Sequence, residues 1–234
     1  MSLILNLESS TEICSVALSS EGTVVDYAES QEGQNHARLM GTYIENLIKR
    51  NKLNVKKLSA VAVSKGPGSY TGLRIGVSMA KGLCYAHGIP LIAVSPLQAM
   101  SSYVSGHRDR WKLPATKDLL FCPMIDARRM EVYTAFYNSE VEEVEEVAAK
   151  IIDKDSFRNI LNRQPVAFMG NGSSKAEKVI EHKNAFFVPG IKTSAQFMCR
   201  LSYKALVSKQ FVNLAYFEPF YLKDFIAGVP KKIF

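Results

Sequence analysis

The sequence has little of what metal centres, disulfide scaffolds and membrane spans require. Its 234 residues contain four cysteines and four histidines, with no CxxC pair and no histidine at metal-ligand spacing from a cysteine. No stretch approaches the roughly 18 consecutive apolar residues of a transmembrane helix. Every cysteine lies in an apolar stretch, so we expect buried, reduced thiols at Cys14, Cys84, Cys122 and Cys199.

Targeting signals and long charged blocks are also missing. The opening residues MSLILNLESS lack the basic region of a signal peptide, so we expect a cytoplasmic protein. The formal net charge of +7 is compatible with a polyanion such as nucleic acid nearby, but the charge is spread along the chain. A hydrophobic fraction of 47% and a charged fraction of 22% are near the averages for globular proteins.

The first hundred residues predict three strands followed by alternating helices and strands. Short alternating segments at 3–9, 13–20 and 23–31 are separated by polar turns and should pair as antiparallel neighbours. Apolar residues at helical spacing predict an amphipathic helix over 36–51. A strand (59–64), a helix (71–87), a strand (90–95) and a helix from about Leu97 complete this half.

The second half repeats the order without repeating the sequence. After a polar, proline-containing stretch at 105–118, we expect strands at 119–127, 131–138 and 141–147. A helix (153–162), strand (165–170), helix (173–181), strand (185–189) and helix (194–208) follow. Two βββαβαβα units predict an α/β protein with the duplicated actin-like, sugar-kinase-like fold, divided into subdomains 1–106 and 107–234. The aromatic tail after Phe211 should pack back over one subdomain as irregular chain.

A glycine-rich loop joins the strand at 59–64 to the next helix. It has the position of a phosphate-binding loop, because a helix N-terminus offers unpaired N–H groups and a positive dipole. The candidate residues are Gly66, Pro67, Gly68, Ser69, Thr71, Gly72 and Arg74 of the loop and the helix start, with Glu8 on the first strand and Thr11 on the turn behind it. The pattern is neither a P-loop nor a dinucleotide fingerprint, and an ordinary tight turn explains it equally well.

The helix after this loop is apolar on two faces. One stripe contains large residues such as Leu73 and Val77, and the second contains smaller ones. A helix that is apolar nearly all round is normally buried on more than one side. We therefore predict a contact surface for another subunit at Ile75, Ser78, Met79, Gly82 and Ala86. The competing interpretation is that the chain's own tail covers this face.

No catalytic set emerges from the remaining residues. Glu8 on the first strand could coordinate Mg²⁺, although a lone acidic residue at a strand end is more often solvated. His36 has Met40 four residues later, so the two-histidine helix motif is missing and His36 is expected to start a helix. Asp126, Arg128, Arg129 and Glu131 form either a polar site or a surface hairpin. We predict no catalytic residues and no metal ligands.

One family matches these motifs. The segments GPGSYTGLRIG (66–76) and IDARRMEVY (125–133) strongly resemble the TsaB family, also called YeaZ, of bacterial proteins needed to make threonylcarbamoyladenosine in tRNA. Weaker matches are LNLESSTEICSVAL (5–18), His36, GVSMAKGL (76–83), IPLIAVSPL (89–97), GNG (170–172) and FYLK (220–223). Relatives usually have Asp where this chain has Glu8, which weakens any claim of autonomous nucleotide handling.

The resemblance implies a partner subunit rather than an enzyme. It implies an actin-like fold, an inactive paralogue of the transferase TsaD, and a complex with TsaD and the ATPase TsaE that modifies the adenosine beside the anticodon. It also implies pairing with TsaD, or with a second copy when alone, through the helices at 36–50 and 71–87. We therefore add Tyr43 and Leu47 of the first helix to the predicted contact surface. ATP and metal are then expected on the partner subunits. The alternatives are a stand-alone ATPase or phosphotransferase and, more remotely, a glycoprotease-like metallopeptidase.

Overall fold

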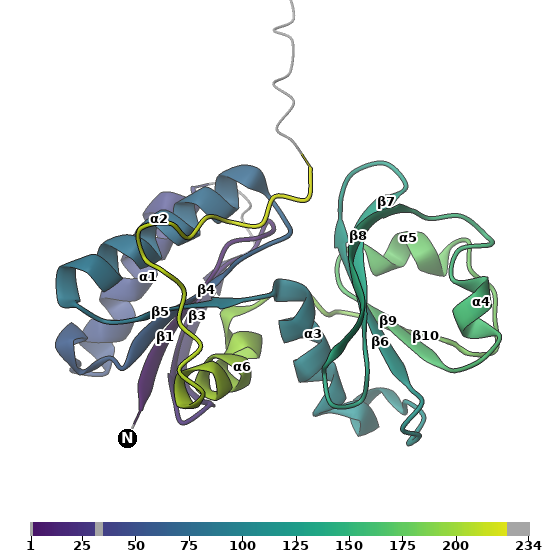
Figure 1. The fold of residues 1–234 in the computed structure, drawn as a ribbon, viewed down its shortest axis with the longest axis horizontal. Coiled ribbons are helices and arrows are strands. Elements are labelled where there is room, and N and C mark those ends of the chain that lie inside the picture. The colour runs from purple at the N-terminus through teal and green to yellow at the C-terminus, as the bar shows by residue number, and fades with distance from the viewer. Residues whose placement is uncertain (1, 31–34, 224–234) are drawn as a thin grey trace, which may run out of the picture.

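The first half of the molecule is a five-stranded mixed sheet. The structure, a computed structural model, describes residues 2–30 and 35–223 (Figure 1). Its elements in this half are β1 (Leu3–Glu8), β2 (Cys14–Ser20), β3 (Thr23–Ser30), α1 (His36–Arg50), η1 (Val55–Lys57), β4 (Ala60–Ser64), α2 (Tyr70–His87), β5 (Leu91–Val94) and α3 (Pro96–Ser105). The strand order is β3-β2-β1-β4-β5, in which β1 pairs antiparallel with β2 and parallel with β4.

The second half has the same sheet topology. Its elements are η2 (Arg108–Trp111), β6 (Leu120–Asp126), β7 (Glu131–Tyr137), β8 (Glu143–Ile151), α4 (Arg158–Leu161), β9 (Val166–Met169), α5 (Ser173–Glu177), β10 (Ala185–Val188) and α6 (Ala195–Val207). The order β10-β9-β6-β7-β8 repeats that of the first sheet element by element. The predicted duplicated actin-like α/β fold is thereby confirmed. Residue 31 of the strand predicted at 23–31 lies outside the described residues.

Two predicted helices of the second half are much shorter in the structure. The helix expected over 153–162 forms only at Arg158–Leu161. Asp153 and Ser156 hydrogen-bond to each other and to nearby backbone N–H groups, which competes with helix formation. Phe157 then has a left-handed φ of 62°, which a helix cannot contain. The helix expected over 173–181 ends at Glu177, and the strand expected over 141–147 runs instead from Glu143 to Ile151.

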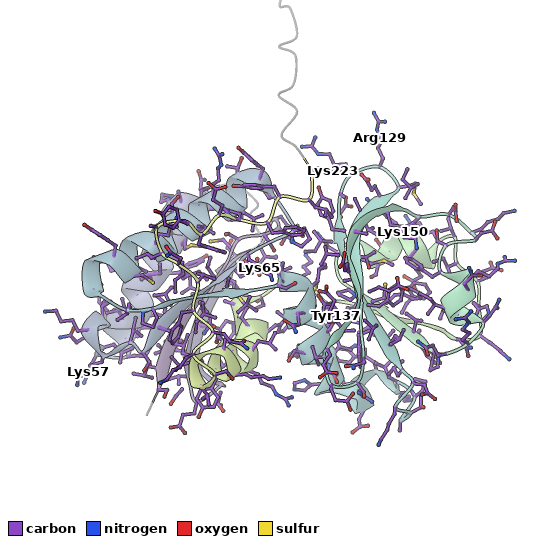
Figure 2. The ribbon with its side chains drawn as sticks, viewed as in Figure 1. Lys57, Lys65, Arg129, Tyr137, Lys150 and Lys223 are labelled. Atoms are coloured by element: carbon purple, nitrogen blue, oxygen red, sulfur yellow. The ribbon has the colours of Figure 1, made fainter. Side chains whose placement is uncertain are left out.

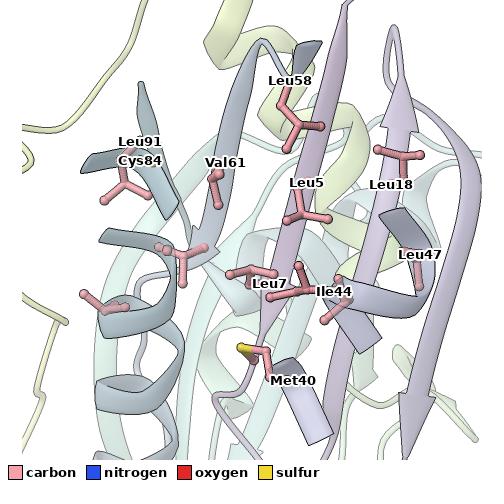
Figure 3. Close-up of a cluster of buried hydrophobic side chains, with 14 of the residues drawn as sticks. Leu5, Leu7, Leu18, Met40, Ile44, Leu47, Leu58, Val61, Cys84 and Leu91 are labelled. Atoms are coloured by element: carbon pink, nitrogen blue, oxygen red, sulfur yellow. The ribbon is translucent and has the colours of Figure 1, made fainter. Parts of the chain in front are cut away.

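The core of the first half lies between the sheet and the helices α1 and α2. Leu5 and Leu7 of β1 contact Met40 and Ile44 of α1, and Val61 of β4 packs in the same cluster (Figure 3). The other face of this sheet is covered by α6, whose Met198 packs against Ile4, Ala60 and Ala62. Both faces of β1 are therefore buried, which explains its nearly continuous apolar run.

The last helix of each half packs beyond its own sheet. Leu97, Met100 and Val104 of α3 pack in the core of the second sheet, whereas α6, from the second half of the sequence, covers the first sheet. A cut between residues 106 and 107 would separate the two sheets, but it would also separate α6 from the sheet that it covers. The two halves therefore share their cores through exchanged helices.

The C-terminal segment, which we define as residues 211–223, lies along α2 (Figure 1). The Val212 N–H donates to the Leu91 carbonyl at 3.0 Å, and Val212, Leu214 and Phe217 pack on the first-half core. The predicted irregular tail thus covers part of the first half. Its residues 224–234 lie outside the described part of the chain.

Candidate functional site

A cleft of about 820 Å³ separates the two halves. From the first half it is lined by the turn after β1, the start of α1 and the glycine-rich loop with the start of α2. The second half contributes the end of β6 and Asn171, and the C-terminal segment contributes Tyr221, Leu222 and Lys223. Among the predicted loop residues, Thr11, Gly68, Ser69, Thr71 and Gly72 line the cleft.

The glycines of the loop allow a close approach to the chain's own backbone. A Cβ atom at Gly68 would overlap the carbonyl oxygen of Ser10, and one at Gly72 would overlap that of Ser9. Ser69 is the N-cap of α2: its Oγ accepts from the Gly72 N–H at 3.2 Å, and its N–H donates to the Ser10 carbonyl at 2.7 Å. Packing against the β1–β2 turn thus accounts for two glycines that the sequence assigned to phosphate approach.

Glu8 lies away from the cleft. Its side chain is fully buried, and its Oε1 accepts a 2.6 Å hydrogen bond from the Ser10 N–H, while Oε2 has no partner. Burial raises the pKa of Glu8, and the hydrogen bonds from Ser10 oppose that rise. Glu8 is therefore not the solvated strand-end group that the sequence favoured, and its side chain does not line the cleft. Gly66, Pro67 and Arg74 also lie outside the cleft lining.

Polar groups of the second half close the cleft on the other side. Lys175 of α5 forms a 2.8 Å ion pair with Asp126 at the end of β6. Asn171 accepts from the Asp126 N–H at 3.0 Å and donates to Glu12 of the first half at 3.1 Å. Arg128 and Arg129 occupy the β6–β7 turn with φ values of 71° and 43°. Both features that the sequence left as alternatives at 126–131 are present, a hairpin turn and a polar cleft wall.

An aromatic contact ties the C-terminal segment to the start of α2. The Tyr221 ring lies 4.7 Å from that of Tyr70, and the Arg74 Nε donates to the Tyr221 hydroxyl at 3.3 Å. Lys223 forms an ion pair with Glu131 of β7, so the segment reaches from the first half to the second (Figure 2). The sequence analysis missed this cluster, because no local pattern relates residues 147 positions apart.

His36 has the place that the sequence predicted for it. It is the first residue of α1, and its Nε2 lies 3.0 Å from the carbonyl oxygen of Thr11. Within residues 2–30 and 35–223, no group of three or more His, Cys, Asp or Glu side chains lies close enough to hold a metal ion. All four cysteines are free and buried, as predicted, and burial raises the pKa of Cys14 to about 11.

The predicted contact surface on α2 is open over part of its length. Ser78, Gly82 and Ala86 are exposed, and none of the described residues lies within 4 Å of where a Cβ of Gly82 would be. Ile75 and Met79 are half-buried, as is Tyr43 on α1. The α2 residues form one strip along the helix, with α1 beside it at Met79, and Ile75 at the N-terminal end of the strip also lines the cleft.

Leu47 does not belong to this surface. Its side chain is 1% exposed and packs in the first-half core with Ile44 and Leu18 (Figure 3). The prediction that Leu47 contacts a partner is therefore wrong for this conformation. The error arose because α1 carries apolar residues at both i+3 and i+4, and spacing alone does not separate its buried side from its exposed side.

The comparisons with known proteins agree with this architecture. Residues 24–231 match a family model described as TsaD, tRNA N6-adenosine threonylcarbamoyltransferase. The chain is 31% identical over 211 residues to the tRNA threonylcarbamoyladenosine biosynthesis protein TsaB of Bacillus subtilis (strain 168), covering 88% of this chain and 87% of that protein. The TsaB protein of Escherichia coli (strain K12) is 33% identical over 137 residues, or 58% and 55% of the two chains.

Solved structures share the fold over nearly the whole chain. YeaZ from Pseudomonas aeruginosa superposes with a TM-score of 0.80 at 24% identity, covering 95% of this chain and 100% of that one. A second crystal structure, of a protein from the same organism described as similar to peptidase YEAZ, gives a TM-score of 0.81 with the same coverage. In the described residues, no helix is long and apolar enough to cross a membrane.

The fold, the cleft and the family model together define an actin-like α/β protein related to the threonylcarbamoyltransferase TsaD. The extent and identity of the matches make the assignment more specific. The chain belongs to the TsaB family.

Proposed function

We propose that this chain is a non-catalytic scaffold or activator subunit in the threonylcarbamoyl modification of tRNA. It would act with a TsaD-like transferase and a TsaE-like ATPase on the adenosine beside the anticodon, in tRNAs that read codons beginning with adenine. The observation that carries the proposal is the match to TsaB proteins over most of both chains, since those relatives are named for threonylcarbamoyladenosine biosynthesis. Such a complex would be cytoplasmic.

The exposed side of α2 supports a role in assembly. Ser78, Gly82 and Ala86 follow one another at four-residue spacing, so they form a line of small, exposed side chains on one side of the helix. Small residues let a second helix approach closely, because interaxial distances of about 8–10 Å depend on the side chains between the helices. We infer that the TsaD-like subunit binds here, and that a second copy of the chain binds here when that subunit is absent.

Two features of the site support the non-catalytic assignment. Glu8, the acidic residue at the end of the first strand, is fully buried with a raised pKa and does not line the cleft. The loop amide of Gly72 is bonded to Ser69 within the chain, and the glycines pack against the chain's own backbone. ATP and metal would accordingly be held by the partner subunits.

Reconstitution from purified subunits tests this function. Threonylcarbamoyl transfer to unmodified tRNA would be measured with TsaD-like and TsaE-like proteins, with and without this chain. We expect transfer to depend on all three proteins, and the isolated chain to hydrolyse no ATP and transfer no group. Full transfer without the chain would refute the proposal.

The cleft supports one alternative function, that of a stand-alone ATPase or phosphotransferase. Its volume of about 820 Å³ is large enough for a nucleotide. Steady ATP turnover by the pure chain that is lost in Glu8→Ala would support this alternative. Because Glu8 lies outside the cleft lining, we expect neither the turnover nor its loss.

A further inference from the structure

The C-terminal segment lies beside the exposed strip of α2, not over it. Its contacts with the helix are a 3.2 Å hydrogen bond from Lys81 Nζ to the Ala215 carbonyl and the Tyr221 contacts with Arg74 and Tyr70. Gly82, in contrast, has no neighbour within 4 Å of its Cβ position. The tail, as far as the structure describes it (up to residue 223), therefore covers one side of α2 and leaves the small residues open.

The strip has a different element of the chain on each side. Successive helical residues turn by about 100°, so Met79 lies on one side of the line Ser78–Gly82–Ala86 and Lys81 on the other. α1 lies on the Met79 side, because the Met79 Cε is 3.9 Å from the Cβ position of Gly41 in α1. On the Lys81 side stands the C-terminal segment. We call this surface the α2 groove, with Ser78, Gly82 and Ala86 as its floor.

Large exposed aromatic side chains border the groove on the tail side. Tyr85 of α2 and Tyr216 of the C-terminal segment are 85% and 84% exposed, more than any other large hydrophobic side chain in the described residues. Exposed apolar groups gathered in one place mark interaction surfaces, and tyrosine is enriched among the residues that dominate binding energy.

Tyr216 is held in position by its own turn. The Asn213 Oδ1 accepts from the N–H groups of Ala215 and Tyr216 at 3.0 and 3.2 Å, and the Asn213 carbonyl accepts from Phe217 at 2.9 Å. Leu214 and Phe217 anchor this turn in the first-half core. The turn thus holds the backbone of Tyr216 in place, while the Tyr216 ring stays exposed and contributes little to the stability of the fold.

We propose that the C-terminal segment forms the second side of the partner-binding surface on α2. Tyr216 of the segment and Tyr85 of α2 are then the main residues that contact the partner. This inference rests on the proposed function and names the part of the surface that sets affinity. The occupant is a helix of the TsaD-like subunit. The TsaD family model matches residues 24–231, which include α1 and α2, so a TsaD-like protein has counterparts of these helices to place on the floor.

Binding of the purified TsaD-like subunit to the full-length chain tests the inference by titration calorimetry, with thermal melting as the check on folding. Tyr216→Ser should weaken binding about tenfold or more without lowering the melting temperature, and Tyr85→Ser should act similarly. The matched control is Tyr27→Ser, at a tyrosine 45% exposed on β3, the opposite edge of the sheet from β5. It should change the affinity less than about twofold.

A fourth variant, Gly82→Arg, separates the inference from the function on which it rests. If Gly82→Arg blocks binding and Tyr216→Ser does not weaken it, the segment is no part of the site and the inference is wrong, while the proposed function stands. If the wild-type chain itself fails to bind the TsaD-like subunit, the proposed function fails. If Tyr216→Ser disrupts only self-association, the occupant is a second copy, which also overturns the inference.

Discussion

The two halves have one sheet topology but very different outer helices. On the outer face of the first sheet, α1 and α2 are 15 and 18 residues long, whereas their counterparts α4 and α5 have 4 and 5 residues. Long helices give a continuous surface on which another helix can pack, and a single turn does not. The two halves thus share a sheet topology, but only the first half has helices long enough to offer a second helix a continuous packing surface.

The end of the central strand also differs between the halves. β1 ends at Glu8, which is fully buried and has no cationic partner in residues 2–30 and 35–223. β6 ends at Asp126, which is exposed to the cleft and paired with Lys175. The first carboxyl is thus enclosed by its own half, and the second faces the space between the halves. The acidic residues that end the two central strands therefore have different surroundings.

The largest expected effect tests a feature that both halves share. In each half, a glycine that follows β4 or β9 in the sequence packs closely against the backbone at the end of β1 or β6. A Cβ at Gly72 would overlap the Ser9 carbonyl, and one at Gly170 would overlap that of Met124. Gly72→Val and Gly170→Val should each lower the free energy of unfolding by at least about 4 kcal/mol, measured by urea denaturation. Tolerance of Gly72→Val alone would mean that the first-half glycine does not serve packing.

The next effect separates core from surface on α1. Leu47→Ala should cost about 3 kcal/mol of stability because it leaves a cavity in the first-half core, yet binding of the TsaD-like subunit should be unchanged below the melting temperature. Tyr43→Ala, at a half-buried residue on the same helix, should cost only about 1 kcal/mol. Loss of binding in a folded Leu47→Ala variant would restore Leu47 to the interface.

The third effect contrasts the two strand-end carboxyls by their pH dependence. The raised pKa of Glu8 means that its protonated form stabilises the fold fully at low pH, and that this contribution is lost as pH rises from the ordinary value of 4.5 through the folded-state pKa. Glu8→Gln, which keeps the buried group neutral, should therefore gain stability over the wild type as pH rises from about 4 to about 8.

Thermal melts across this range check the sign, with Asp126→Asn as the comparison. The Gln variant should be about 1–3 kcal/mol more stable than the wild type at the upper end, because the wild-type carboxylate then carries a buried negative charge that the amide lacks. Asp126 is exposed and paired, so Asp126→Asn should shift stability by less than about 1 kcal/mol. A wild-type chain that gains stability relative to Glu8→Gln as pH rises would contradict the assignment.

The smallest effect tests two glycines of one helix that have opposite environments. Gly82→Ala should raise stability by about 0.5–1 kcal/mol, since nothing contacts its Cβ position and alanine is the better helix former. Gly76→Ala in the same helix should lower stability, because its Cβ would overlap the Ser9 Oγ. Chemical denaturation of both variants gives the two signs, and a matching pair of signs would refute the open-floor description of the α2 groove.

Much of this fold could be predicted from periodicity. The order of strands and helices and the start of α1 at His36 could be predicted from the sequence. Apolar residues recur with period 2 in strands and with period 3.6 in amphipathic helices. The second-half helices were overestimated because apolar spacing ignores the side-chain hydrogen bonds of Asp153 and Ser156. Local competition of that kind appears only once the backbone is placed.

The site was less predictable than the fold. Whether Glu8 faces solvent, the cleft or the interior depends on β1 being the central strand, and a single strand's sequence does not give its place in the sheet. The contact of Tyr221 with Tyr70 joins distant segments for which the sequence has no local signal. By contrast, the small residues of α2 could be found, since four-residue spacing follows directly from helical geometry.

The exchange of α3 and α6 has a consequence for synthesis of the chain. A nascent polypeptide that has emerged only as far as residue 106 has a first sheet with one face still bare, because Met198 and Cys199 of α6 have not yet been made. Domains usually fold in order as they leave the ribosome. Here the first sheet must wait for residues 195–207, so the two halves become stable together, and equilibrium unfolding should be a single transition in which neither half outlasts the other.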